Sequence, residues 1–125
     1  MAAQVHAFGN DVLGDLDGTA VAALIRTGEL SRREVLRAAL GRVEPVDQEL
    51  CAVLVLDPER ALATTARPRP GPFSGVPTFV KDNTDLAGLP TGQGSEAFVA
   101  PPAKHHAPFT RALLGAGLVP LGKSR

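Results

Sequence analysis

The spacing of apolar residues predicts a helix that begins near Asp15. Its apolar positions recur at intervals of three and four residues, as on one face of a helix: Leu16, Ala20, Ala23 and Leu24. Gly28 is expected directly beyond its end, because many helices are followed by a left-handed residue, a conformation that glycine adopts easily. Residues 1–14 show no such period, and we expect them to form a flexible or docking arm.

A second helix is predicted to begin immediately afterwards. Ser31 and Glu34 have the spacing of a capping box, in which each side chain accepts a hydrogen bond from the backbone N–H of the other residue. The apolar stripe that follows consists of Val35, Leu36, Ala39, Leu40 and Val43. We expect Pro45 to end this helix, and the short connection predicts an antiparallel pair of helices.

The apolar run over residues 52–56 predicts a short buried strand. Asp57 and Pro58 suit the N-cap and first turn of a third helix, which is expected to reach about Ala66. Residues 15–66 are therefore expected to form a helical N-terminal region. Cys51, the only cysteine, lies in an apolar stretch and is expected to be buried.

A proline-rich connector, residues 67–74, is predicted to separate that region from the rest of the chain. Beyond it, apolar runs predict strands over residues 76–80 and 118–121. A last helix is expected to open at Pro108 and to close at Gly117. Its expected apolar face consists of Phe109, Leu113 and Leu114. Alternating helices and strands predict an α/β fold with a mixed, partly parallel sheet, in which both of these runs are central strands.

The composition argues against several classes of protein. Thirteen Lys and Arg balance thirteen Asp and Glu, so no net charge attracts nucleic acid or a membrane surface. The chain lacks Trp and Tyr, whose rings would stack on single-stranded nucleic acid, and no apolar run approaches the ~20 residues of a membrane span. The first residues lack the pattern of a signal peptide, and a single cysteine allows no intrachain disulfide. These features predict a cytoplasmic protein.

Lys81 is the main candidate for chemistry. It follows an apolar run and precedes Asp82 and Asn83, at a point where the backbone leaves the core. A lysine in this position can simply extend its ammonium into solvent. It can also act as a base, provided that burial leaves the amine neutral near neutral pH. The position of Lys81 alone does not decide between these roles.

Three other features are weaker candidates. Residues 117–124 match the phosphate-binding pattern G-x-x-x-x-G-K-[ST], but a working phosphate loop follows a strand and opens a helix, whereas here a helix precedes the first glycine. His105 and His106 are adjacent without an evident third metal ligand, and we expect them in an exposed loop. The remaining basic residues near the motif are expected to be solvated charges: Lys104, Arg111 and Lys123.

Four motifs in order resemble the amidase signature family. They are Gly75-Val-Pro-Thr-Phe-Val-Lys-Asp-Asn83, Ala87-Gly-Leu-Pro-Thr91, Gly94-Ser95 and Ala116-Gly-Leu-Val-Pro-Leu-Gly-Lys-Ser124. Members typically show G-[IV]-P-x-x-[VI]-K-D-N, A-G-x-P-T, a glycine–serine pair and A-G-A-x-x-x-G-K-[ST]. The resemblance extends from about Asp15 to the last residue. Two departures are Arg125, where members usually have Asn, and Gly92, in a loop that is more often T-T-x-G-S.

The resemblance implies an amidase that hydrolyses a small carboxamide through a Ser–cis-Ser–Lys triad and an acyl-enzyme, with no metal and no organic cofactor. Lys81 corresponds to the lysine of the triad, the general base and later the general acid, acting through the bridging serine. Both serines of the family lie downstream of the G-K-[ST] motif, whereas this sequence ends at Arg125. Residues 75–125 are therefore expected to form an incomplete start of the amidase signature domain, inactive by itself.

Two alternatives stay open. One is a non-catalytic truncated fragment or docking module. The other is the amidase subunit of a tRNA-dependent amidotransferase, whose loop after K-D-N usually contains a cysteine. Gly92-Gln-Gly-Ser95 has no cysteine, which favours the amidase.

Overall fold

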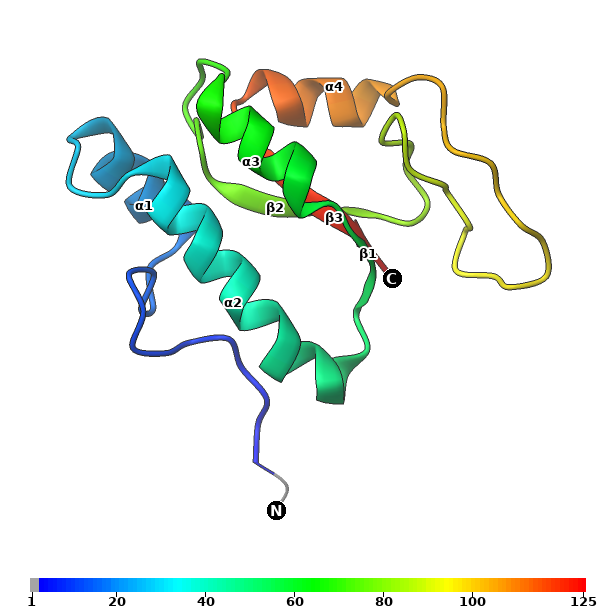
Figure 1. The fold of residues 1–125 in the computed structure, drawn as a ribbon, viewed down its shortest axis with the longest axis horizontal. Helices are drawn as coiled ribbons and strands as arrows, with labels where there is room; N and C mark the ends of the chain where they lie inside the picture. Colours follow the sequence, from blue (N-terminus) through cyan, green and yellow to red (C-terminus); the bar gives the residue numbers. More distant parts are fainter. Residues whose placement is uncertain (1–2) are drawn as a thin grey trace.

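The computed structural model describes residues 3–125 as four helices and a three-stranded sheet (Figure 1). The helices are α1 (Gly18–Arg26), α2 (Arg32–Leu50), α3 (Pro58–Ala66) and α4 (Pro108–Gly115), and the strands are β1 (Val53–Leu56), β2 (Pro77–Lys81) and β3 (Val119–Ser124). This arrangement confirms the predicted α/β class. Residues 1 and 2 of the expected N-terminal arm lie outside the described residues. Within residues 3–125, every helix falls short of the length and apolar character that crossing a membrane requires.

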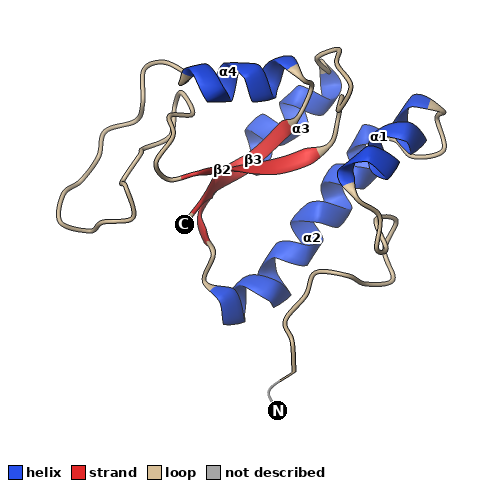
Figure 2. Ribbon diagram, turned by 180° about the vertical axis from the view of Figure 1, so that it is seen from behind, coloured by secondary structure: helices blue, strands red, loops and turns tan. Residues whose placement is uncertain are grey.

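The strand that comes last in the sequence lies in the middle of the sheet, in the order β1-β3-β2. Figure 2 shows its pairing partner β2 beside it. β3 is parallel to β2 and antiparallel to β1. It is buried over Val119–Lys123, which confirms it as a central strand. Among the described residues, β1 and β2 each pair with β3 alone. β2, also expected to be central, therefore lies at an edge here. The strand predicted over residues 52–56 is confirmed as β1, but it is at most half-buried, so its predicted burial was wrong.

α1 begins later than predicted and buries a different face. Asp17 is its N-cap, and the Asp17 carboxylate accepts a hydrogen bond from the N–H of Ala20 at 2.8 Å. Because the helix starts at Gly18, Leu16 precedes it and is exposed. The residues of α1 that face the core are Val21, Ala22 and Ile25. The predicted face was therefore wrong.

The turn between α1 and α2 agrees with the prediction. Gly28 has a φ of +78°, and the N–H of Glu29 behind it donates to the carbonyl of Leu24 at 3.0 Å. At the start of α2, the N–H of Glu34 donates to Ser31 Oγ at 3.1 Å, and the N–H of Ser31 donates to the Glu34 carboxylate at 2.9 Å. The glycine stop and the capping box are both confirmed.

α2 continues through Pro45, so the prediction that Pro45 ends this helix was wrong. Pro45 is exposed, where water can hydrate the carbonyl that its missing N–H leaves free. The helix ends instead at Leu50, and the carboxylate of Asp47 in its last turn accepts hydrogen bonds from the N–H groups of Ala52 and Val53 beyond the end, at 2.6 and 2.9 Å. Cys51, expected to be buried, is exposed as the C-cap, with a φ of +48°.

Two groups of buried residues form the core, and α2 contributes to both. The first joins α1 and α2 to the start of β2: Leu13, Val21, Ala22, Ile25, Val35 and Val76. The second joins α2 and α3 to the central strand: Leu36, Ala61, Val119 and Leu121. This packing holds β2 and β3 in place, and their carboxyl ends carry the candidate chemistry.

α4 buries Thr110 and Leu114, whereas Phe109, predicted to face the core, is 64% exposed. The hydroxyl of Thr110 donates to the carbonyl of Asp85 at 2.7 Å, and the N–H of Ala107 donates to the same carbonyl at 3.0 Å. A polar residue is buried here because it fastens the loop that follows β2.

Candidate active site

Lys81 is the last residue of β2 and lies opposite Ser124, at the edge where the parallel strands β2 and β3 both end. Ligands of open α/β sheets commonly bind beyond the carboxyl ends of the strands. The side chain of Lys81 is exposed, and within residues 3–125 it takes part in none of the hydrogen bonds or salt bridges. Its ammonium is therefore available to a group approaching this edge. The catalytic role of Lys81 stays a prediction.

Asp82, the next residue, is 7% exposed. Its two carboxylate oxygens accept hydrogen bonds from the N–H groups of Gly92 at 2.9 Å and Gly94 at 3.0 Å. Burial raises the pKa of Asp82, but these backbone donors and the charges of Lys123 and Arg125 outweigh it and hold the pKa below its usual value. The carboxylate is therefore ionised at neutral pH.

Lys123, expected to be a solvated charge, is completely buried, so that prediction was wrong. Four oxygens surround its Nζ: the carbonyls of Thr84 at 2.8 Å and Pro90 at 3.3 Å, Thr91 Oγ1 at 3.0 Å and Asp82 Oδ1 at 3.8 Å. Burial lowers the pKa of Lys123, while the carboxylates of Asp82 and Asp85 act in the opposite direction. The sequence signal was the G-K-S run at the end of the fourth motif, but hydrogen-bond partners 32 to 39 residues away cannot be found from local spacing.

The prediction of an exposed loop was wrong for His106 and right for His105. His106 is half-buried, and its Nδ1 accepts a hydrogen bond from the N–H of Ala87 at 3.0 Å. Burial, and then the charges of nearby arginines, lower the pKa of His106, so the ring is neutral at neutral pH. In the part of the chain that the structure describes, no three His, Cys, Asp or Glu side chains are arranged to hold a metal ion. His106 thus supports the loop after β2 through its hydrogen bond with Ala87.

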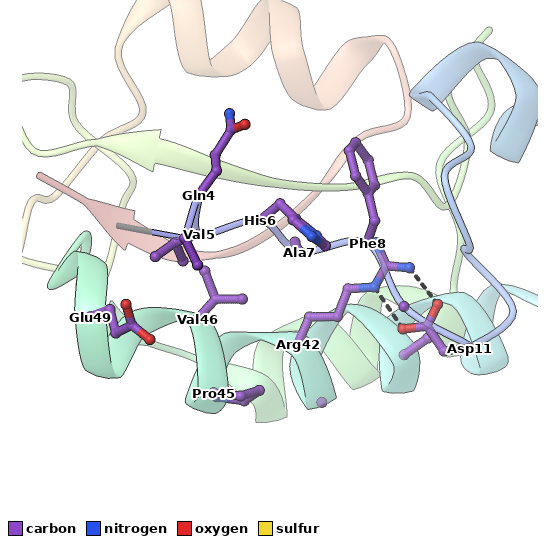
Figure 3. A pocket seen from close by; sticks show the side chains of 14 residues that line it. Gln4, Val5, His6, Ala7, Phe8, Asp11, Arg42, Pro45, Val46 and Glu49 are labelled. Carbon is purple, nitrogen blue, oxygen red and sulfur yellow. Dashed lines mark hydrogen bonds and ion pairs between the residues drawn. The ribbon is translucent and has the colours of Figure 1, made fainter. Parts of the chain in front are cut away.

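A hollow of about 570 Å³ lies between the segment before α1 and the second half of α2 (Figure 3). Arg42 Nε donates to Asp11 Oδ2 at 2.6 Å, and Arg42 Nη2 donates to the carbonyl of Gly14 at 2.7 Å. The hydrogen bond from Arg42 is the main reason that the pKa of Asp11 is lowered to about 2. Because the two charges are paired with each other, they dock the N-terminal segment on α2. Lys81 is not among the residues that line this hollow, and we assign no chemistry to it.

Comparison with known proteins gives consistent matches. Residues 34–125 match a family model described as Amidase. AmiC of Mycobacterium leprae (strain TN) is 46% identical over 122 residues, which cover 98% of this chain and 26% of AmiC. A glutamyl-tRNA(Gln) amidotransferase subunit of Salinispora arenicola (strain CNS-205) is 37% identical over 120 residues, which cover 90% of this chain and 24% of the Salinispora protein.

Among solved structures, the native peptide amidase from Stenotrophomonas maltophilia matches with a TM-score of 0.81 and 30% identity, over 91% of this chain and 25% of that enzyme. The chain therefore spans about a quarter of the length of the relatives that it matches.

Proposed function

This chain belongs to the amidase family, as its four motifs predicted, and on that premise we propose that the protein hydrolyses the C–N bond of a small carboxamide with Lys81 as its base. The observation that carries this proposal is the contrast between the two lysines near the ends of β2 and β3. The Nζ of Lys123 is buried and surrounded by oxygens, whereas the side chain of Lys81 is exposed beside Ser124. Lys81 is therefore the lysine that is free to exchange a proton with a reacting group.

The proposed mechanism follows the triad that the family resemblance implies. Lys81, in its neutral form, takes a proton from the nucleophilic serine through the bridging serine. The serine oxygen attacks the amide carbonyl, and the protonated Lys81 returns the proton to the leaving nitrogen as the C–N bond breaks. Water then hydrolyses the acyl-enzyme by the same proton path. The neutral form requires that other parts of the protein cover Lys81, because water keeps an exposed ammonium charged.

A chimera tests this proposal. Residues 1–125 are joined to the remainder of the Mycobacterium leprae AmiC chain, and hydrolysis of simple aliphatic and aryl amides is measured. We expect Lys81→Ala and Lys81→Arg to lower the turnover number by about 10⁴-fold or more, because arginine keeps the charge but cannot be deprotonated. Lys104→Arg, at an exposed lysine outside the site, is the matched control and should keep the wild-type rate. The 125 residues alone should show no turnover.

Lys81→Arg with most of the wild-type turnover would refute the assignment of Lys81 as the base. A chimera that folds but turns over no amide favours the non-catalytic docking module instead.

A second candidate is the amidase subunit of a tRNA-dependent amidotransferase, which the 37% identity to the Salinispora arenicola protein favours. This chain would then be part of one subunit of a larger enzyme, as the name of that relative implies. Turnover of simple amides without any partner distinguishes the first candidate from this one. For either activity we propose a cytoplasmic location, which the use of a single cysteine supports.

A further inference from the structure

We propose that Lys123 is a positioning residue: its buried ammonium holds the loop of residues 82–94 against the end of β3 and thereby fixes the backbone of Lys81. The functional part of this inference rests on the proposed function of Lys81. The structural part, a loop organised around one cation, does not.

The hydrogen bonds of Lys123 require the charged form of the side chain. The carbonyls of Thr84 and Pro90 can only accept hydrogen bonds. The hydroxyl of Thr91 donates a hydrogen bond to Asp85 Oδ1 at 2.7 Å. Its single hydrogen is used there, so towards Lys123 its oxygen can only accept a hydrogen bond. Three acceptors need three N–H donors, which an ammonium has and a neutral amine lacks. Lys123 is therefore a cation and is not the base of a proton-transfer reaction.

The loop around this cation has little regular structure of its own. Between the end of β2 and α4, the structure has turns and one isolated bridge, which joins Pro90 to Pro102. The partners of Lys123 come from both arms of the loop of residues 82–94. Thr84 lies near the start of this loop, and Pro90 and Thr91 lie near its end. The ammonium thus draws the two arms together. Because Thr84, Pro90 and Thr91 are half-buried, removing the charge leaves polar groups that are partly shielded from water without this partner.

Asp82 completes the arrangement from the other side. Its carboxylate lies 3.8 Å from the Lys123 Nζ and accepts the hydrogen bonds from Gly92 and Gly94. A Cβ at position 92 would lie 3.1 Å from Asp82 Oδ2, so a glycine there permits this close approach. Opposite charges in a buried site hold the loop in one conformation, because separating them exposes each to an unfavourable environment.

The loop transmits this order to Lys81 through the backbone. The N–H of Asp82 donates to the carbonyl of Ser124 at 2.8 Å, and the N–H of Thr84 donates to the carbonyl of Lys81 at 3.0 Å. Lys81 is therefore fixed on its carboxyl side by a segment that Lys123 holds. A displacement of about 1 Å in a reacting group lowers a rate by about 10²-fold, so a loosened loop is expected to lower turnover.

The test uses the chimera and four variants. Lys123→Met removes the charge and keeps most of the volume. Thr91→Val, included in case the first variant does not fold, removes one acceptor of Lys123 together with the hydrogen bond from Thr91 to Asp85. Thr91→Ser is the conservative control, because it keeps the hydroxyl, and Lys104→Met removes an exposed charge. Hydrogen–deuterium exchange is measured over residues 82–95 and over α1 and α2, together with kcat and KM.

We expect Thr91→Val to raise amide exchange in residues 82–95 by about tenfold and to lower kcat with little change in KM. Exchange in α1 and α2 should not change, and Lys123→Met should have the larger effect. Thr91→Ser and Lys104→Met should behave as wild type. Loop exchange within twofold of wild type in Thr91→Val and in any folded Lys123→Met overturns the structural part of the inference.

A loosened loop with unchanged kcat overturns the positioning role. If Lys81→Arg is active, the proposed function fails, but the exchange measurement still tests the role of Lys123 in the loop.

Discussion

Gly122 and Gly41 should respond to the same substitution with opposite sign. A Cβ at Gly122 would overlap the carbonyl oxygen of Val55, and the next atoms, Val55 C at 2.8 Å and Leu56 Cα at 3.0 Å, are also backbone. No side-chain rotation can relieve this contact, so β1 must move away from β3. The backbone angle φ of Gly122, +154°, adds strain, because residues other than glycine rarely adopt this conformation. Overpacking of about 1–3 kcal/mol and backbone strain of about 1–3 kcal/mol together predict a loss of about 3 kcal/mol or more for Gly122→Ala.

Gly41→Ala should instead stabilise the protein. Gly41 is exposed in the interior of α2, and a Cβ there would meet no atom within 4 Å. Alanine is favoured over glycine in such positions by about 0.8–1 kcal/mol. Urea unfolding of the 125-residue chain measures both effects, and far-UV circular dichroism is the suitable signal because the chain has no Trp or Tyr. Equal stability of Gly122→Ala and wild type would refute the close approach of β1 and β3.

Two further predictions concern charge and thiol chemistry. Asp11 has a pKa of about 2 against an ordinary value of 3.8, so its ion pair with Arg42 stabilises the folded state above pH 3.8, and this contribution disappears as the pH falls toward 2. Asp11→Asn should therefore lower the free energy of unfolding at pH 7 by at most about 1 kcal/mol, and the difference from wild type should vanish near pH 2; a difference that is constant over this range contradicts the ion pair. Cys51 is exposed, so the native chain should react with Ellman's reagent about as fast as the urea-unfolded chain, and protection of the thiol would contradict its position at the end of α2.

Local signals in the sequence predicted the elements that depend on local hydrogen bonds. The capping box of Ser31 and the glycine stop at Gly28 involve neighbours in the chain, so a short window contains both partners. Pro45 misled the prediction because a proline removes only one hydrogen bond, which an exposed helix can lose, while the actual turn depends on the carboxylate of Asp47. Cys51 was misplaced for the same reason, since the turn sets its exposure.

The candidate site was predicted in part. The motifs drew attention to Lys81, and the strand before it is confirmed, but Lys123 was taken for a solvated charge. A lysine is usually exposed, and what reverses that preference here is a set of oxygens from another part of the chain, together with Asp82. The burial of Thr110 has the same origin, a carbonyl acceptor contributed by a distant loop. Tertiary contacts of polar groups leave no periodic pattern in the sequence.

The strand order β1-β3-β2 has a consequence for the time at which the sheet can form during synthesis. β1 and β2 do not pair with each other, so neither can join the sheet before β3 has been synthesised. Val53 of β1 pairs with Ser124, about 70 residues later in the chain. The helical pair α1 and α2 depends on neighbours in sequence and can form early, whereas sheet formation has a high contact order and is correspondingly slow. A nascent chain that has reached α4 therefore carries two strands with unpaired edges, and unpaired strand edges make an incompletely folded chain prone to aggregation.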